Sequence, residues 1–115
     1  MYEKKILKDF NCGITATMEV IGGKWKTCLI NRINKGTKRP SELHRAYPHA
    51  SARVLNQQLA ELEMHHVLEK TIYQVLPPKV EYNLTELGRS LLPLISCIES
   101  WGLDHADVIK NNDHN

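Results

Sequence analysis

The predicted architecture starts from residues 40–65, which read PSELHRAYPHASARVLNQQLAELEMH. Ser41, followed by an acidic residue, is typical of the N-terminal cap of a helix. The Tyr47-Pro48 step ends that short helix, because the residue before a proline is disfavoured in the helical region. Ser51 is placed to cap a longer helix that reaches the end of the segment. The pattern therefore predicts two helices joined by a short turn.

The second of these helices has an apolar face and a polar face. At 100° per residue, Leu55, Leu59 and Leu62 fall within about 60° of one another. Arg53 and Gln57 fall on the opposite side of the helix. We therefore expect the three leucines in the core and the two polar side chains in solvent.

Two further helices are predicted upstream, over residues 14–21 and from about residue 24 to residue 36, because apolar residues recur there every three or four positions. A glycine pair stops the first of them, since glycine adopts a left-handed cap without steric cost. Trp25 and Cys28 fall on the apolar face of the second helix. We expect both in the core.

A β-hairpin and a last long helix are predicted downstream. Residues 68–73 and 80–84 are β-prone, and the second run alternates apolar with polar residues as a half-buried strand does. The tip between them carries two prolines, which prevent it from extending the ladder. We expect Thr85 to cap the last helix, Pro93 to bend or break it, and residues 110–115 to fray.

The last helix carries an apolar stripe that is wider than one small domain needs. Burial against a second copy of the chain, in a homodimer, is the interpretation we favour. Burial in the core of a single chain is the alternative, and the sequence leaves both open. The stripe consists of Leu87, Leu91, Leu94, Ile95, Ile98, Trp101 and Leu103.

Charge is distributed unevenly along this chain of 115 residues, whose length suits one domain spanning residues 1–115. The net charge is only +2. Residues 1–60 hold eleven Lys/Arg against four Asp/Glu, a balance of +7, whereas residues 61–115 hold four against nine, a balance of −5. The basic excess is concentrated in residues 22–53. This pattern suggests a partner with negative charge.

Cysteine usage and motif content argue against several function classes. Three cysteines without a CxxC pair do not make a disulfide-stapled scaffold, and the six histidines do not sit beside cysteines at zinc-finger spacing, so we expect no metal and no cofactor. The lack of a Ser/His/Asp order, a phosphate loop or an HExxH motif argues against an enzyme. No apolar run is long enough to span a bilayer, so we expect a cytoplasmic protein with no membrane partner.

The predicted order of elements describes a mainly α winged helix-turn-helix with a small β-hairpin wing. The second helix of such a unit enters the major groove of DNA. Arg53, Asn56 and Gln57 are therefore predicted to read bases, since Arg matches guanine and Asn or Gln matches adenine. The residues predicted to contact phosphates, which set affinity and register, are Lys38, Arg39, Ser41, Arg45, Ser51 and Lys79.

Other interpretations of the same residues stay open. Each polar residue named for DNA contact is also consistent with an ordinary solvated surface position, and Ser41 is favoured as a helix cap over any chemical role. The rival function is a small protein-interaction module that docks a protein through its apolar C-terminal helix and does not bind DNA. The basic run and the polar outer face of the helix after Ser51 argue against that module.

Two sequence blocks make the chain resemble a known family. They read IGGKW at residues 21–25 and PPKVEYNLTELG at residues 77–88, and Cys12 precedes the first helix. From Cys12 to Gly102 the chain resembles the HxlR-type winged helix-turn-helix transcription regulators of bacteria and archaea. The resemblance implies a homodimer on a pseudo-palindromic DNA operator, with the first and last helices forming the dimer interface. One recognition helix of each subunit would enter successive major grooves.

Cys12 is the candidate sensor residue. A thiol that precedes a helix has its pKa lowered by the helix dipole, which favours the reactive thiolate. In the family that the chain resembles, several members sense electrophiles or oxidants through a cysteine at this position. They commonly have proline next, where Gly13 stands here. Oxidation would give a sulfenic acid and then a disulfide, with Cys97 as a candidate partner. The sequence leaves open whether Cys12 is a sensor or an unmodified thiol, and it favours simple packing for Cys97.

Overall fold

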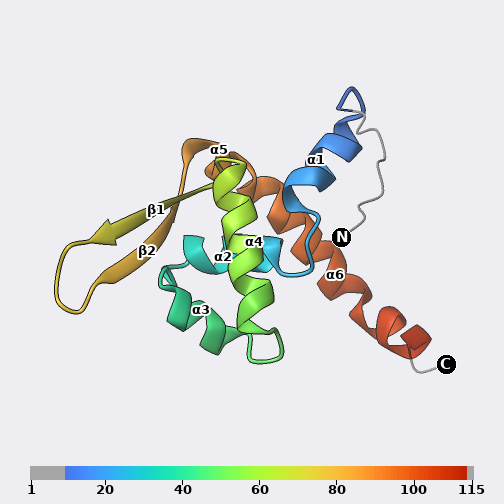
Figure 1. Cartoon of the computed structure of the whole chain (residues 1–115). Coiled ribbons are helices and arrows are strands. Elements are labelled where there is room, and N and C mark those ends of the chain that lie inside the picture. Colours follow the sequence, from blue (N-terminus) through green and yellow to red (C-terminus); the bar gives the residue numbers. More distant parts are fainter. Residues whose placement is uncertain (1–9, 114–115) are drawn as a thin grey trace, which may run out of the picture.

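The computed structural model describes residues 10–113. They form helices and a two-stranded antiparallel hairpin in the order that the sequence predicts (Figure 1). The bounds are α1 Gly13–Ile21, α2 Lys26–Asn34, α3 Pro40–Ala46, α4 Ala52–Met64, β1 Leu68–Tyr73, β2 Lys79–Leu84, α5 Glu86–Ser90 and α6 Leu92–Asp113. The arrangement of α3, α4 and the hairpin confirms the winged helix-turn-helix fold.

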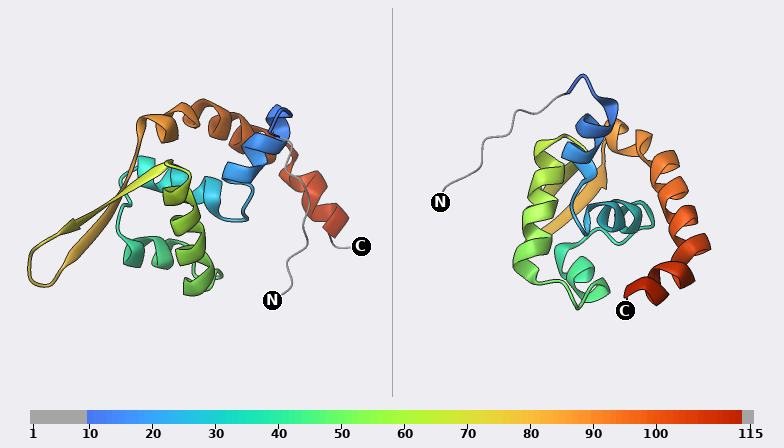
Figure 2. Two further views of the ribbon diagram at one scale, coloured as in Figure 1. Left: turned by 45° about the horizontal axis from the view of Figure 1, so that its top comes forward. Right: turned by 90° about the vertical axis from the view of Figure 1, so that its right-hand side faces the viewer.

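The core is built around α2, which contacts α4, α6 and β2 (Figure 2). Its buried side chains are Leu29, Ile30 and Ile33. They pack against the inner face of α4, where the three leucines predicted from the helical spacing are all fully buried. The remaining members of this core include Ile21, Leu43, Val67, Leu68, Tyr82 and Ile95.

Two residues that the sequence assigns to the core lie at its margin. Cys28 is exposed, so that prediction is wrong. The reason is that α2 turns Leu29, Ile30 and Ile33 inward, and Cys28 falls on the other side of the helix. Trp25 is half-buried and packs against the core from its edge, with its ring centroid 5.4 Å from that of Tyr47.

Two of the three predicted N-terminal helix caps are observed in the structure. Ser51 Oγ accepts a hydrogen bond from the backbone N–H of Val54 at 3.1 Å, and Thr85 Oγ1 accepts one from the N–H of Gly88 at 3.0 Å. The prediction that Ser41 caps α3 is wrong, because the cap residue is Arg39 and Pro40 occupies the first turn. Proline is favoured there, since its missing N–H has no partner inside the helix at that position.

The end of α1 is predicted correctly, but for a different physical reason. Gly22 is not left-handed, since its φ is −82°. Its N–H donates to the carbonyl of Met18 at 2.8 Å, and a Cβ at this position would collide with that same carbonyl oxygen. Glycine is required here by the close approach of two backbone segments.

The two predicted strands form an antiparallel hairpin. Leu68 lies opposite Leu84 and Tyr73 lies opposite Lys79, so β2 begins one residue earlier than expected. The expected alternation of buried and exposed side chains in β2 is weak. Tyr82 is the one residue of this strand that is buried, and the others are partly exposed. The backbone N–H of Tyr82 donates to the carbonyl of Lys38 at 2.8 Å and so ties the loop before α3 to the hairpin.

The last predicted helix is broken as expected. The chain turns at Leu91, between α5 and α6, and Pro93 is the second residue of α6, where it costs no helical hydrogen bond. The prediction of fraying is wrong for residues 110–113, because α6 continues to Asp113. Cys97 is exposed, and its assignment to packing is also wrong within the single chain, since Ile95 is the residue that α6 buries.

Candidate nucleic-acid interface

The three residues predicted to read bases lie together on the outer face of α4. Arg53, Asn56 and Gln57 are all exposed, as the helical spacing indicates. Arg53 is the second residue of the helix and makes no hydrogen bond or ion pair within residues 10–113. Its guanidinium is therefore available to an external acceptor such as a guanine edge.

The other two side chains are held by neighbours on the protein. Asn56 Oδ1 lies 3.0 Å from Nε2 of His44 on α3, and Gln57 Nε2 donates weakly to Oε2 of Glu61 at 3.4 Å. The His44 contact joins the two helices of the helix-turn-helix on the face where the residues predicted to read bases lie. Sequence reasoning missed it, because twelve residues separate the partners and no local spacing rule connects them.

The residues predicted for phosphate contact are placed in three groups. Arg39, Ser41 and Arg45 are exposed on and just before α3. Ser51 is exposed at the start of α4, where its oxygen already accepts a hydrogen bond and its hydroxyl proton stays available. Arg45 and Ser51 therefore flank the turn of the helix-turn-helix, whereas Arg39 and Ser41 lie at the opposite end of α3.

The remaining two lysines lie apart from that group. Lys79 is at the start of β2, with Nζ 3.8 Å from Oε2 of Glu81 and 4.5 Å from the ring centroid of Tyr73. Its charge is therefore partly balanced within the hairpin. Lys38 is half-buried and lines a hollow on the side of β2 together with Arg89.

One lysine of the basic run is a core residue. Lys26 is only 4% exposed, and its Nζ lies 2.7 Å from Oε1 of Glu61. The hydrogen bond from Lys26 and its positive charge lower the pKa of the Glu61 carboxyl against the opposing effect of desolvation. The pair joins α2 to α4, and the N–H of Trp25 adds a second link by donating to Oε1 of Gln58 at 2.9 Å. Lys26 therefore orients the helices and contributes little to the external field.

Cys12 lies where a reactive thiol is expected. It is the exposed N-cap residue of α1. Its thiol pKa is lowered, first by a hydrogen bond from the Thr15 side chain and then by the backbone N–H groups of Thr15 and Ile14. An open hollow of about 570 Å³ borders the thiol and is lined by Cys12, Gly13, Ile14, Thr17, Met18 and Leu94.

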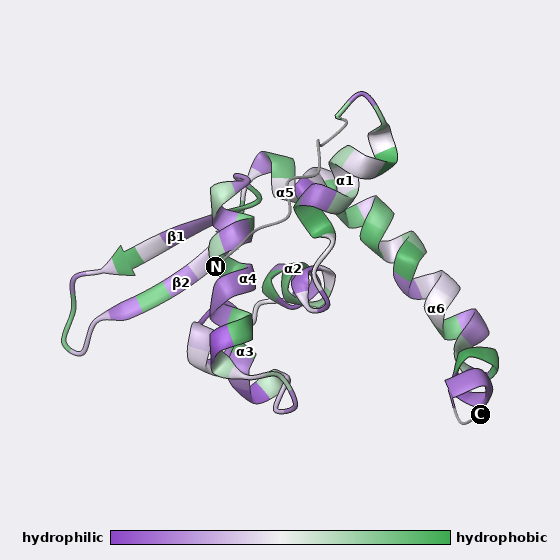
Figure 3. Cartoon of the chain, turned by 45° about the vertical axis from the view of Figure 1, so that its right-hand side comes forward, coloured by the Kyte–Doolittle hydropathy of each residue, from purple (hydrophilic) through white to green (hydrophobic). Residues whose placement is uncertain are grey.

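Apolar side chains continue from this hollow along α1 and α6. Trp101 and Leu103 are 61% and 73% exposed, and Ile14 and Met18 of α1 are exposed as well. Figure 3 shows hydrophobic segments along α6, which extends away from the rest of the chain. We call the exposed apolar residues that share one side of these two helices the α1–α6 face, consisting of Ile14, Met18, Leu94, Ile98 and Trp101.

Residues 10–113 contain neither a candidate membrane-spanning helix nor a candidate metal-binding cluster. None of the helices there is both long enough and apolar enough to cross a membrane. No three His, Cys, Asp or Glu side chains in that range gather closely enough to hold a metal ion.

A polar-faced helix after a short turn, flanked by a hairpin wing, defines a winged helix-turn-helix DNA-binding protein. The chain belongs to the HxlR-like helix-turn-helix family, whose model matches residues 20–110. It is 45% identical over 102 residues to the HTH-type transcriptional regulator YtcD of Bacillus subtilis (strain 168), a match covering 89% of this chain and 81% of that protein.

Solved structures agree with this assignment. The redox regulator HypR in its reduced form superimposes with a TM-score of 0.80 at 40% identity, covering 86% of this chain and 98% of that one. HypR in its oxidized form gives a TM-score of 0.77 at 42% identity, covering 81% of this chain and 96% of that one. The protein is therefore a DNA-binding transcription regulator, which is a non-enzymatic class.

Proposed function

We propose that the protein binds a pseudo-palindromic operator as a homodimer, with α1 and α6 forming the interface. The α1–α6 face carries this proposal, because it leaves large apolar side chains such as Ile98 and Trp101 in water. Contiguous exposed apolar area is typical of a protein–protein interface. In a two-fold dimer one such face is buried against its own copy.

The dimer would place one α4 in each of two successive major grooves, about 34–36 Å apart along the DNA. Arg53 would pair with a guanine and Asn56 with an adenine, while Gln57 would contribute a further base contact. Arg39 and Ser41 at the start of α3, Arg45 and Ser51 beside the turn, and Lys79 at the hairpin would contact phosphates. The half of the chain with a balance of +7 supplies the DNA-facing helices, in keeping with this orientation.

A charge placed in the α1–α6 face tests the dimer. Trp101→Glu should give a monomer by light scattering and weaken operator binding about 10²-fold or more, because the second half-site contact is no longer tethered. Met64→Glu is the matched control, since Met64 is 63% exposed and lies outside that face. A wild-type protein that is monomeric, or that binds no DNA duplex selected from a random pool, would instead favour the protein-interaction module.

For the signal, we infer that Cys12 senses an electrophile or an oxidant such as a hydroperoxide. Its exposure and lowered pKa support this role, and the similar protein HypR is a redox regulator. The thiolate would attack the terminal hydroperoxide oxygen, so that an S–O bond forms, the O–O bond breaks and an alkoxide leaves and takes up a proton. The thiolate of Cys97 on the second copy would then attack the Cys12 sulfur, forming the disulfide and releasing hydroxide, which becomes water on protonation.

Single cysteine variants test this step. After diamide treatment the wild-type dimer should run as a covalent dimer on a non-reducing gel and change its affinity for the operator. Cys12→Ser and Cys97→Ser should both abolish the crosslink, whereas the control Cys28→Ser should retain it. If Cys12→Ser still loses operator binding after diamide, Cys12 is not the switch.

A further inference from the structure

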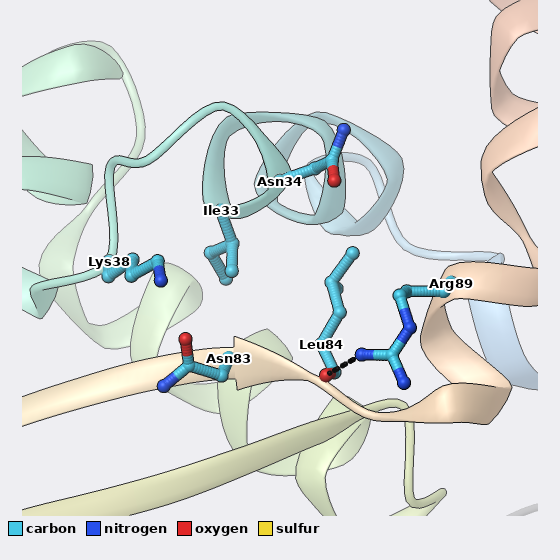
Figure 4. Close-up of a pocket in the computed structure, with 6 residues that line it drawn as sticks. All are labelled: Ile33, Asn34, Lys38, Asn83, Leu84 and Arg89. Atoms are coloured by element: carbon cyan, nitrogen blue, oxygen red, sulfur yellow. Dashed lines mark hydrogen bonds between the residues drawn. The ribbon is translucent and has the colours of Figure 1, made fainter.

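A hollow of about 260 Å³ lies between the end of α2, the end of β2 and α5 (Figure 4). No residue of α4 lines it, so it is separate from the base-reading face. Its position links the loop that leads into α3 with the helix that leads into α6. The lining residues are Ile33, Asn34, Lys38, Asn83, Leu84 and Arg89.

The lining chemistry is that of an anion site. Two cations and two carboxamides surround an apolar surface formed by Ile33 and Leu84, and none of the lining side chains is acidic. Arg89 uses one nitrogen, Nη1, to donate to the carbonyl of Leu84 at 3.0 Å. Its other guanidinium donors, and the side chain of Lys38, have no hydrogen-bond or ion-pair partner among residues 10–113. Two like charges beside one hollow are stabilised by an anion between them.

The two cationic residues are held by the backbone of the fold. The carbonyl of Lys38 accepts from the N–H of Tyr82 at 2.8 Å, which anchors the residue to β2. The N–H of Arg89 donates to the carbonyl of Thr85 at 2.9 Å within α5, a helix that Thr85 also caps. Because the backbone at both positions is fixed, a bound ligand has to order only the side chains of Lys38 and Arg89.

We propose that this hollow binds a small organic anion, a carboxylate on a compact apolar body. The planar fork of Arg89 suits two carboxylate oxygens, Lys38 supplies a second positive charge, and Ile33 and Leu84 contact the apolar body. The volume is below the 300–1,000 Å³ of pockets for drug-sized molecules, so the ligand is small. A phosphate of the DNA backbone is the other source of the same chemistry, and the experiment separates the two.

The test is a titration of the nitrogen-15-labelled full chain without DNA, followed by NMR at constant ionic strength. The probes are benzoate, which combines a carboxylate with an apolar ring, and inorganic phosphate. Benzoate should give saturable shifts confined to residues 33–38 and 83–89. Arg89→Gln should weaken benzoate binding by about tenfold or more, and Arg89→Lys by less, because it keeps the charge and loses the fork.

A negative charge introduced at the rim provides a second variant that removes no contact of the fold. Asn34→Asp should weaken benzoate binding by about tenfold or more through repulsion. Asn31→Asp makes the same change one turn earlier on α2, outside the hollow, and should leave binding unchanged. Thermal unfolding of each variant checks that the fold is intact.

Three results would overturn the proposal: benzoate shifts that are absent or do not saturate, equal losses in Asn34→Asp and Asn31→Asp, or saturable shifts with phosphate and none with benzoate. The last result would assign the hollow to a phosphate group. Because the titration contains no DNA, a failure of the proposed operator binding leaves its outcome unaffected.

Discussion

Replacing Arg53 with alanine should remove sequence-specific DNA binding and leave the fold unchanged. The side chain is exposed and makes no hydrogen bond or ion pair within residues 10–113, so its loss should change the free energy of unfolding by less than about 0.5 kcal/mol. A bidentate arginine–guanine pair contributes about 1–3 kcal/mol of discrimination. Two half-sites in a dimer give about 2–6 kcal/mol, which is a loss of about 30-fold to about 10⁴-fold in operator affinity.

The assay is fluorescence anisotropy with the operator and with a scrambled duplex of the same length, each at several salt concentrations. Arg53→Ala should weaken binding to the operator far more than to the scrambled duplex, and should leave the salt dependence nearly unchanged. Lys35→Ala is the control, because Lys35 is an exposed cation at the end of α2, away from α4. Equal losses on both duplexes would mean that Arg53 contacts a phosphate, and no loss on either would refute its assignment to the interface.

Three further predictions follow from contacts of the fold. Glu61→Gln should destabilise the protein at neutral pH. The pKa of Glu61 in the folded protein lies below its usual value of 4.5, so the difference in unfolding free energy from wild type should vanish as the pH falls through that lowered pKa. Urea unfolding between pH 7 and pH 3 measures this difference. Gly88→Ala should cost about 1–3 kcal/mol in chemical unfolding, because its Cβ would collide with a backbone carbonyl, whereas Gly102→Ala, which meets nothing, should be neutral or slightly stabilising. His44→Ala should release Asn56 and lower discrimination at one base pair of each half-site by about tenfold or less, measured with single-base operator variants.

Most of the fold could be predicted from the sequence because its signals are local. The spacing of Leu55, Leu59 and Leu62 predicts the inner face of α4, and Ser51 and Thr85 cap helices through bonds that span three residues. The same kind of local rule gave a wrong cap at Ser41. Pro40 strongly favours the first position of a helix, so α3 begins at Pro40 and Arg39 becomes the cap residue.

The candidate site was predictable in its residue types and less so in its contacts. The exposure of Arg53 follows from helical spacing alone. The His44–Asn56 bond and the Lys26–Glu61 ion pair join residues far apart in the chain. Pairs of this kind depend on how two helices pack, which no short stretch of sequence specifies.

Local signals in the sequence predict the order of the helices and strands within residues 10–113, and they place the residues predicted to read bases on the outer side of α4. Helical periodicity and capping depend on residues three or four positions apart, so both can be recognised in one sequence without knowing how the elements pack. The packing of the elements against one another buries Lys26, exposes Cys28 and Cys97, and brings Lys38 and Arg89 to one hollow. Burial and charge pairing depend on the orientation of each element against its neighbours, and that orientation is set by the packing of the whole core.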